Sequence, residues 1–353
     1  MIRVLVVEDS ITVRKRLIEI LVRDPELEVV GEAGDGRRAV ELTRALRPDV
    51  ITLDLVLPDM NGLAATEHIM AHVPTPILIV SASFNRGAMF DTYSALAAGA
   101  VDVLDKPRGD NDAAWEQRFV AAVRMVSRIK VITHLRGRID GSHRASRQVP
   151  VMPRAAPTEG PSDIVALGAS TGGPGALVDV IDAMSPDLPV PTIVVLHIDL
   201  AFARSFAEWL GIQTGRVVHV AQDRDPVTGP PGRVLFAPAG HHLVVERGLA
   251  RLTSDPPRHH CRPSVDTLFE SIAVEYGARA AAALLTGMGR DGATGLLAIR
   301  RAGGFTIAQD EATSTVYGMP REAVLCGAAD RVLPLGDIGA ALEMWMHRTE
   351  RRR

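Results

Sequence analysis

Short runs of apolar residues alternate with segments of helical periodicity along the first 126 residues. We interpret the apolar runs as β-strands, and they are Val4–Val7, Val29–Ala33, Val50–Leu53, Ile77–Val80 and Val101–Leu104. These runs are continuous rather than alternating, which is typical of strands that are buried on both faces of a parallel sheet. Between the strands, apolar residues recur at helical spacing, as in Trp115, Phe119, Val123 and Val126. The pattern predicts five successive βα units.

A second α/β alternation follows a segment of different character. Residues 127–161 carry seven Lys/Arg and four prolines and lose periodicity, which indicates a linker. Strands are then predicted at Ile164–Leu167, Thr192–Ile198, Val234–Ala237, Ala280–Thr286 and Phe305–Ala308, and Leu243–Thr253 with its break at Arg247-Gly248 reads as a hairpin. We therefore predict an α/β protein with domains at 1–126 and 162–348, a linker at 127–161 and a basic tail at 349–353. The second domain is expected to be a doubly wound, mostly parallel sheet with an added hairpin.

Composition narrows the possible partners. The chain has 353 residues, of which 46% are hydrophobic, and a net charge of −3, so it is globular and has no electrostatic footprint for nucleic acid. No run of about 20 apolar residues is present, so no direct membrane insertion is expected, and we expect a cytoplasmic protein. Two cysteines, Cys261 and Cys326, favour a reducing compartment. The run His259-His260-Cys261 has no matching second pair of ligands, and we expect an ordinary surface segment there.

Polar residues stand at the ends of four strands predicted in the first domain. Glu8 and Asp9 follow the first strand, Asp54 the third, Ser81 the fourth and Lys106 the fifth. The carboxyl ends of parallel strands form one crevice, so these residues should converge. Three carboxylates that lie close together repel one another unless a hard divalent cation such as Mg²⁺ lies among them. A carboxylate beside Mg²⁺, with a hydroxyl and an ammonium for phosphoryl oxygens, can itself be phosphorylated, and Asp54 is the candidate.

These residues, with the run from Asp54 to Gly62, resemble the receiver domain of two-component response regulators over nearly all of residues 1–125. The resemblance implies a flavodoxin-like fold, phosphoryl transfer from a sensor histidine kinase to Asp54, and contacts from Ser81 and Lys106 to the phosphoryl group. It implies a Mg²⁺ site formed by Glu8, Asp9, Asp54 and the backbone carbonyl of Val56. Val103 stands where many receivers carry a switch aromatic, three residues before the lysine.

A glycine-rich loop follows the first strand of the second domain. The run from Gly168 to Pro174 could bind phosphate on free backbone N–H groups, or it could present Ser170 as a nucleophile with amides as oxyanion donors. A serine nucleophile requires a base, and His197 ends the next strand. Asp291 follows the strand that ends at Thr286 and could orient the imidazole, although Asp199 is a competing carboxylate.

The Ser170 loop, the His197 strand end and four further segments together resemble the chemotaxis protein-glutamate methylesterase family over nearly all of residues 163–345. The further segments are Ala237–Leu243, Arg262–Phe269, Thr286–Ala293 and Gln309–Arg321. The resemblance implies a serine hydrolase, with no cofactor for the reaction, that demethylates glutamate γ-methyl esters and deamidates glutamines on the cytoplasmic helices of methyl-accepting chemoreceptors. It implies Ser170 as nucleophile, His197 as base, Asp291 as orienting carboxylate, and an oxyanion hole from Thr171, Gly172 and Met288.

Near the base the chain departs from the family. Leu196 replaces a usual glutamine, and Ile198-Asp199 replace a usual Met-Pro. These changes support an alternative, in which the second domain is a receiver-controlled binding module without turnover that docks on a receptor or kinase. A transcription factor is disfavoured because no basic recognition helix is present. His241 and His242 precede the hairpin, and we expect a structural role for them.

Overall fold

The computed structural model describes residues 1–81, 86–106, 112–129, 131, 164–198 and 200–350. The chain divides into two compact units, Met1–His143 and Arg144–Arg353, and each is described by itself. Most of the predicted linker lies outside the described residues, as does the end of the predicted basic tail. The last helix, α11, includes Leu335–Glu350.

The first unit is a five-stranded parallel sheet with the order β2-β1-β3-β4-β5, and the five predicted βα units are confirmed. Its strands are β1 (Ile2–Val7), β2 (Leu27–Ala33), β3 (Val50–Leu53), β4 (Ile77–Ser81) and β5 (Asp102–Asp105). Its helices are α1 (Ile11–Val22), α2 (Gly36–Leu46), α3 (Gly62–His72), α4 (Arg86–Ala97) and α5 (Ala113–Val126).

Local sequence explains where these helices begin. Ser10, Asp35, Asn61 and Asp112 are N-cap residues whose side chains accept a hydrogen bond from the backbone N–H three residues later. Such caps satisfy donors that the first helical turn leaves free. Val50–Leu53 is buried along its whole length, as predicted for a central parallel strand. The polar strand ends therefore emerge at one edge of a rigid sheet.

The second unit contains a seven-stranded parallel sheet with the order β14-β13-β12-β6-β7-β9-β8. Its strands are β6 (Ile164–Ala169), β7 (Thr192–Leu196), β8 (Val218–Val220), β9 (Val234–Phe236), β12 (Ala280–Leu284), β13 (Phe305–Gln309) and β14 (Arg331–Leu333). Its helices are α6 (Gly173–Asp182), α7 (Leu200–Thr214), α8 (Val265–Tyr276), α9 (Ala293–Arg301), α10 (Met319–Leu325) and α11, and η2 (Gly277–Arg279) is a 3-10 turn.

The predicted hairpin is present but does not join the large sheet. Strands β10 (His242–Glu246) and β11 (Leu249–Thr253) pair antiparallel with each other as a separate two-stranded sheet. Leu243, Val245 and Ala250 belong to the same buried core as Leu268 and Phe269 of α8, so the hairpin is attached by side-chain packing. The expectation of a hairpin added to the sheet is corrected in this respect.

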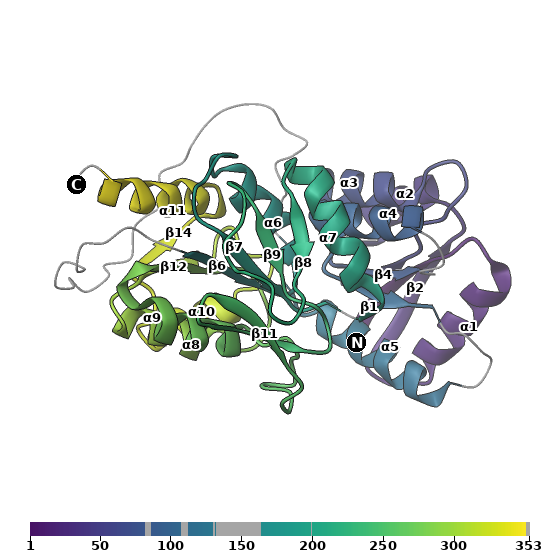
Figure 1. The fold of residues 1–353 in the computed structure, drawn as a ribbon. Coiled ribbons are helices and arrows are strands. Elements are labelled where there is room, and N and C mark those ends of the chain that lie inside the picture. Colours follow the sequence, from purple (N-terminus) through teal and green to yellow (C-terminus); the bar gives the residue numbers. More distant parts are fainter. Residues whose placement is uncertain (82–85, 107–111, 130, 132–163, 199, 351–353) are drawn as a thin grey trace. The chain divides into compact units, whose positions relative to one another are not determined.

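Helices cover both faces of the second sheet. In Figure 1, α6 and α11 lie on one side of it and α8 and α9 on the other. Strand β6 is hydrogen-bonded to β12 on one side and to β7 on the other. Strands that follow β6 in the sequence are added on both of its sides, first β7, β9 and β8 and later β12, β13 and β14. Such a switch point is where open α/β sheets bind ligands. In the part of the chain that the structure describes, no helix is long and apolar enough to cross a membrane.

Candidate active site

The loop after β6 presents Ser170 at the start of α6. The Ser170 N–H donates to the Thr286 carbonyl at 3.0 Å, and the Ser170 carbonyl accepts from the Gly173 N–H at 2.7 Å. Gly172 has a φ of 76°, and a Cβ there would lie 2.4 Å from Thr315 Oγ1. Only glycine combines this backbone conformation with so close an approach. The loop is thus a tight turn whose shape depends on its glycines.

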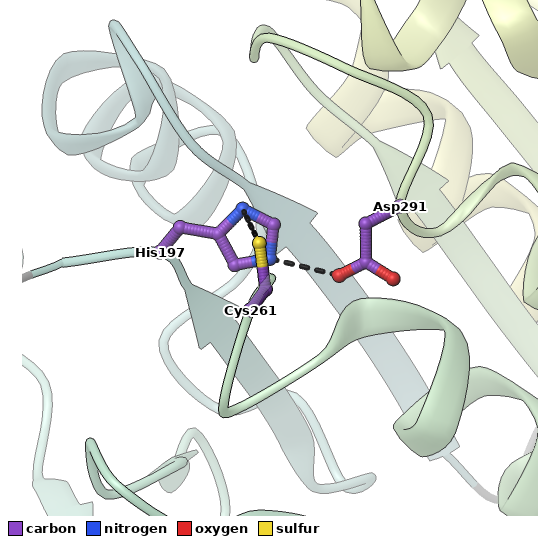
Figure 2. Close-up of side chains that lie close together, drawn as sticks. All are labelled: His197, Cys261 and Asp291. Atoms are coloured by element: carbon purple, nitrogen blue, oxygen red, sulfur yellow. Dashed lines mark hydrogen bonds and ion pairs between the residues drawn. The ribbon is translucent and has the colours of Figure 1, made fainter. Parts of the chain in front are cut away.

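His197 lies directly beside this loop. Its backbone N–H donates to the Ala169 carbonyl at 3.0 Å, which continues the pairing of β6 and β7 by one residue. Its ring Nε2 lies 2.8 Å from Asp291 Oδ2, as Figure 2 shows, and its side chain is 13% exposed. The imidazole is therefore held by a carboxylate and remains reachable from solvent.

Asp291 lies in the loop between β12 and α9, and its carboxylate caps the N-terminus of α8. Its carboxylate accepts hydrogen bonds from the Ser264 hydroxyl at 2.7 Å, the Val265 N–H at 2.7 Å and the Asp266 N–H at 3.1 Å, besides His197. A helix N-terminus presents unpaired N–H groups and a positive dipole end, which stabilise an anion. Burial raises the pKa of Asp291, but the bond and charge of His197 and the bonds from Ser264 and Val265 outweigh it, and the net pKa is lowered.

The same partners control the protonation of His197. Burial lowers the pKa of His197. The hydrogen bonds to Asp291 and Cys261 and the charges of these two residues raise it by more, so the net pKa is about 9 instead of the ordinary 6.5. An opposite charge nearby favours the protonated ring. The site therefore stabilises an imidazolium, which is the form that a general base acquires when it accepts a proton.

Ser170, His197 and Asp291 follow strands β6, β7 and β12 respectively, and these three strands are neighbours in the sheet in the order β12-β6-β7. No hydrogen bond joins the Ser170 hydroxyl to His197 among the described residues. Because Nε2 is bonded to Asp291, Nδ1 is the ring nitrogen that remains to take a proton from Ser170. Nucleophile–base contacts are commonly loose without substrate.

The amides predicted for the oxyanion hole lie in two loops: Thr171 and Gly172 in the loop after β6, and Met288 in the loop after β12. In the described parts of the chain, the N–H groups of Thr171, Gly172 and Met288 donate no backbone hydrogen bond. The Thr286 hydroxyl donates to the Thr171 carbonyl at 2.9 Å and so ties the loop after β6 to the loop after β12. Met288 is 41% exposed.

The segment His259-His260-Cys261 is partly exposed, as expected for a surface segment, but its backbone places Cys261 beside His197. Arg258 and Cys261 exchange backbone hydrogen bonds of 3.1 and 2.8 Å, and His259 and His260 between them have φ values of 52° and 65°. This left-handed two-residue turn brings Cys261 Sγ to 3.6 Å from His197 Nδ1. The sequence contained no glycine or asparagine to signal such a turn.

Sequence reasoning also missed how Ser264 is placed. His242 is 1% exposed, and its Nδ1 accepts the Ser264 N–H at 3.1 Å, while its Nε2 lies 3.2 Å from the Pro256 carbonyl. His242 thus holds the residue that binds Asp291, which is the structural role expected for it. The signal was present in the Arg262–Phe269 run, but the sequence did not say which carboxylate Ser264 would meet.

The departures next to His197 have different outcomes. Leu196 is 1% exposed, and its Cδ1 lies 2.5 Å from where a Cβ on Gly173 would be. Its side chain therefore packs under the Ser170 loop. Asp199, the competing carboxylate, lies outside the described residues.

A second polar cluster lies at the carboxyl edge of the first sheet. Lys106 Nζ is 2.8 Å from Asp54 Oδ2 and 2.8 Å from Glu8 Oε2. Glu8, Asp54 and Ser81 are at most 3% exposed, and Asp9 is exposed. Burial raises the pKa of Glu8, and Asp54 adds to the effect, although Lys106 opposes it. Burial lowers the pKa of Lys106, but the two carboxylates outweigh it and the net pKa is raised.

One position behind this cluster requires glycine. A Cβ on Gly62 would lie 2.2 Å from the Asp54 carbonyl oxygen and 2.7 Å from Leu55 Cα. Backbone atoms cannot move aside as a flexible side chain can, so this close approach fixes the loop that follows Asp54. Val56, whose carbonyl the resemblance to receiver domains implies as a Mg²⁺ ligand, is 66% exposed in that loop.

Comparisons with known proteins agree with both halves of the chain. The family model described as CheB methylesterase matches residues 165–342, and the response regulator receiver domain model matches residues 4–114. A relative from Anaeromyxobacter dehalogenans is 46% identical over 97% of this chain and 96% of its own length. A second relative, from Nitrosospira multiformis, is 43% identical over 97% of this chain and 96% of its own length. Both are named protein-glutamate methylesterase/protein-glutamine glutaminase.

Solved structures from Thermotoga maritima match each half separately. The CheB methylesterase catalytic domain is 35% identical, with a TM-score of 0.49, and covers 52% of this chain and 98% of its own. The response regulator domain of CheB is 38% identical, with a TM-score of 0.34, and covers 37% of this chain and 98% of its own.

Proposed function

Because the chain belongs to the CheB methylesterase family, with a response regulator receiver domain ahead of the esterase domain, we propose that it is a phosphorylation-controlled protein-glutamate methylesterase and protein-glutamine glutaminase. Its substrates would be γ-glutamyl methyl esters and glutamines on the cytoplasmic helices of chemoreceptors. The observation that carries the proposal is the 2.8 Å bond between His197 and a buried, helix-bound Asp291, beside the Ser170 loop.

In the proposed reaction Ser170 Oγ attacks the ester carbonyl carbon and its proton passes to His197 Nδ1. The amides of Thr171, Gly172 and Met288 would stabilise the resulting oxyanion. The imidazolium then gives its proton to the leaving methoxide, and methanol departs from an acyl-enzyme. Water, activated by the same nitrogen, hydrolyses this ester to glutamate. With glutamine as substrate, ammonia leaves in place of methanol.

The receiver half would be phosphorylated on Asp54 by a sensor histidine kinase. Oxygens of Glu8, Asp9 and Asp54 lie within 4.8 Å of one another, and oxygen donors are what Mg²⁺ prefers, so these residues fit the ion. When bound, Mg²⁺ would neutralise charge on the transferring phosphoryl group. Lys106, which already contacts Asp54 at 2.8 Å, would pair with a phosphoryl oxygen. The Ser81 hydroxyl has no hydrogen-bond partner in the described chain and is available for another.

Methanol release from methylated receptor membranes, measured with and without a phosphodonor, tests the proposal. We expect release by the wild type, a higher rate with the phosphodonor, and a loss of about 10³-fold or more in Ser170→Ala, because the members of a triad act as a unit. A folded wild-type protein that binds receptor membranes without releasing methanol would instead support a binding module. Near-normal turnover in Ser170→Ala would move the nucleophile elsewhere.

A further inference from the structure

The proposed base also belongs to a cluster of metal-ligating atoms. A nitrogen of His197, the sulfur of Cys261 and an oxygen of Asp291 all lie within 4.8 Å of one another (Figure 2). Imidazole nitrogen, thiolate sulfur and carboxylate oxygen are the donors that zinc takes in proteins. The esterase chemistry proposed above uses His197 and Asp291 but assigns no role to Cys261.

Cys261 is held at this place by its own turn. The backbone bonds between Arg258 and Cys261 close the turn, and His259 and His260 adopt left-handed conformations that non-glycine residues rarely take. The Arg258 guanidinium donates a hydrogen bond of 2.8 Å to the Glu270 carboxylate, which anchors the turn to α8. Strained backbone of this kind persists only where its surroundings determine it.

The ring of His197 is already oriented as in metal sites. Zinc-binding histidines usually donate the second ring N–H to a carboxylate, which fixes the ring and makes the other nitrogen a better ligand. Here Nε2 is bonded to Asp291 at 2.8 Å, and this distance is too short for an ion between the two atoms. Nδ1 lies 3.6 Å from Cys261 Sγ, close to the separation of about 3.5 Å between nitrogen and sulfur ligands of one tetrahedral zinc.

We propose that His197 Nδ1 and Cys261 Sγ bind a zinc-class divalent ion, with Asp291 as the outer partner of the ring and water in the remaining positions. On binding near neutral pH, the protons held by Cys261 Sγ and His197 Nδ1 are released to solvent, because a metal ion binds the thiolate and the unprotonated ring nitrogen. The sulfur, which Figure 2 draws in front of the ring, must enter the ring plane, where the Nδ1 lone pair lies. The ion occupies the nitrogen that would accept the Ser170 proton, so zinc inhibits the esterase reversibly. This consequence rests on the proposed function, whereas binding itself does not.

Cys326 provides a matched control within the same chain. It is the other free cysteine of the sequence and is exposed, and its Sγ lies 3.4 Å from the Ala323 carbonyl and 3.7 Å from the Ala293 carbonyl. Partial desolvation by the surrounding chain raises the pKa of Cys326, so its thiolate is disfavoured. Among the described residues, Cys326 belongs to none of the clusters that could hold a metal ion.

The test titrates the full-length protein with Co²⁺ as a spectroscopic probe, in excess Mg²⁺ so that the receiver carboxylates are occupied. We expect a thiolate-to-cobalt charge-transfer band at one ion per chain in the wild type and in Cys326→Ser, removed by Zn²⁺. Cys261→Ser should lack the band. A band of equal intensity in Cys261→Ser, or none in the wild type, would overturn the site.

Inhibition is measured separately as methanol release against Zn²⁺ concentration, each variant relative to its own zinc-free rate. Wild type and Cys326→Ser should be inhibited alike and recover with a chelator, and Cys261→Ser should need about tenfold or more Zn²⁺. Equal sensitivity of Cys261→Ser would refute inhibition through this site. A protein that shows the cobalt band but has no esterase activity would overturn the proposed function and leave the metal site supported.

Discussion

At the scale of single residues, the charge on Asp291 decides what His197 can do. Two backbone N–H groups and the Ser264 hydroxyl hold the carboxylate as an anion, and the anion in turn raises the pKa of His197. This arrangement favours the imidazolium that His197 would form as the proposed base. It also leaves little neutral imidazole near pH 7 to accept the Ser170 proton.

The rate should therefore rise with pH through the neutral range. The pKa of His197 is about 9, above its ordinary value of 6.5, so the base form is scarce below about pH 9 and increases towards it. We expect kcat/KM for methyl-ester hydrolysis to increase up to about this pH, since this parameter reports the free enzyme. In Cys261→Ser, which removes a bond and a charge that raise the pKa, the rising limb should move to lower pH. A profile that is flat from neutral pH to about 9 would contradict this.

Asp291→Asn should lower kcat by about 10³- to 10⁴-fold, because the ring loses the acceptor that orients it. Ser264→Ala is the matched control. It removes one 2.7 Å bond to the same carboxylate and the cap of α8, so we expect a smaller loss of rate and a fall of about 1 kcal/mol in the free energy of unfolding. Steady-state kinetics and urea unfolding measure both. If Asp199→Asn is the more damaging change, Asp291 is not the orienting residue.

At the scale of elements, the site depends on how closely the loops after β6 and β12 approach each other. A Cβ on Gly287 would lie 2.7 Å from Ser170 Cβ and 2.3 Å from Met319 Sδ. The Thr286 carbonyl and hydroxyl bind the same loop, so the two loops form one packed unit. The position of Ser170 is therefore set by its neighbour in the sheet as well as by its own turn.

Gly287→Ala should displace the Ser170 loop. We expect overpacking to lower the free energy of unfolding by about 1–3 kcal/mol. We also expect kcat/KM to fall by a larger factor than KM rises, which means that kcat itself falls. Gly336→Ala in α11 is the control, since a Cβ there meets nothing within 4 Å and alanine favours a helix. Thermal unfolding and methanol release report the two effects. Unchanged kinetics in a folded Gly287→Ala protein would mean that the loop tolerates the shift.

At the scale of the whole molecule, one chain joins a response regulator receiver domain to a CheB methylesterase domain. In the receiver unit, Lys106 pairs with both Glu8 and Asp54, and phosphorylation would add charge and oxygen acceptors at Asp54. Val103 pairs with Ile79 in the sheet and replaces the usual switch aromatic, so any response must pass through backbone and packing shifts. We therefore expect modest activation.

Asp54→Asn should abolish labelling by acetyl phosphate or by the kinase, because the acceptor carboxylate is gone, and removal of Mg²⁺ by a chelator should do the same to the wild type. Ser170→Ala serves as the control and should be labelled normally. Radiolabel incorporation or intact mass measures the phosphoryl group. Label that survives in Asp54→Asn would place the phosphosite on another residue.

Deleting residues 1–150 should raise basal esterase activity above that of the unphosphorylated full-length protein. A tethered domain acts at an effective concentration in the range of about millimolar, so even a weak covering contact by the receiver would inhibit. The second unit has its own hydrophobic core, which supports folding of the fragment. Methanol release by the fragment and by the full-length protein, with and without phosphodonor, makes the comparison. A folded fragment that is no faster would refute autoinhibition.

The sequence by itself determined the strands, the two α/β units and the residues with chemical potential. Val50–Leu53 and Ile164–Leu167 could be read as strands because continuous apolarity is a local property of the chain. Asp54 and Ser170 could be singled out because they follow predicted strands, and the carboxyl ends of parallel strands carry the functional groups of such sheets.

Only the tertiary structure decided which of these residues meet. That β12 lies beside β6, that the hairpin pairs with itself, and that Asp291 sits on the N-terminus of α8 all depend on contacts between distant segments. The approach of Cys261 to His197 depends on a left-handed turn at His259 and His260, where no residue of permissive conformation marks it. Local propensity cannot reveal such features, because the free energy that stabilises them comes from packing against elements remote in the chain.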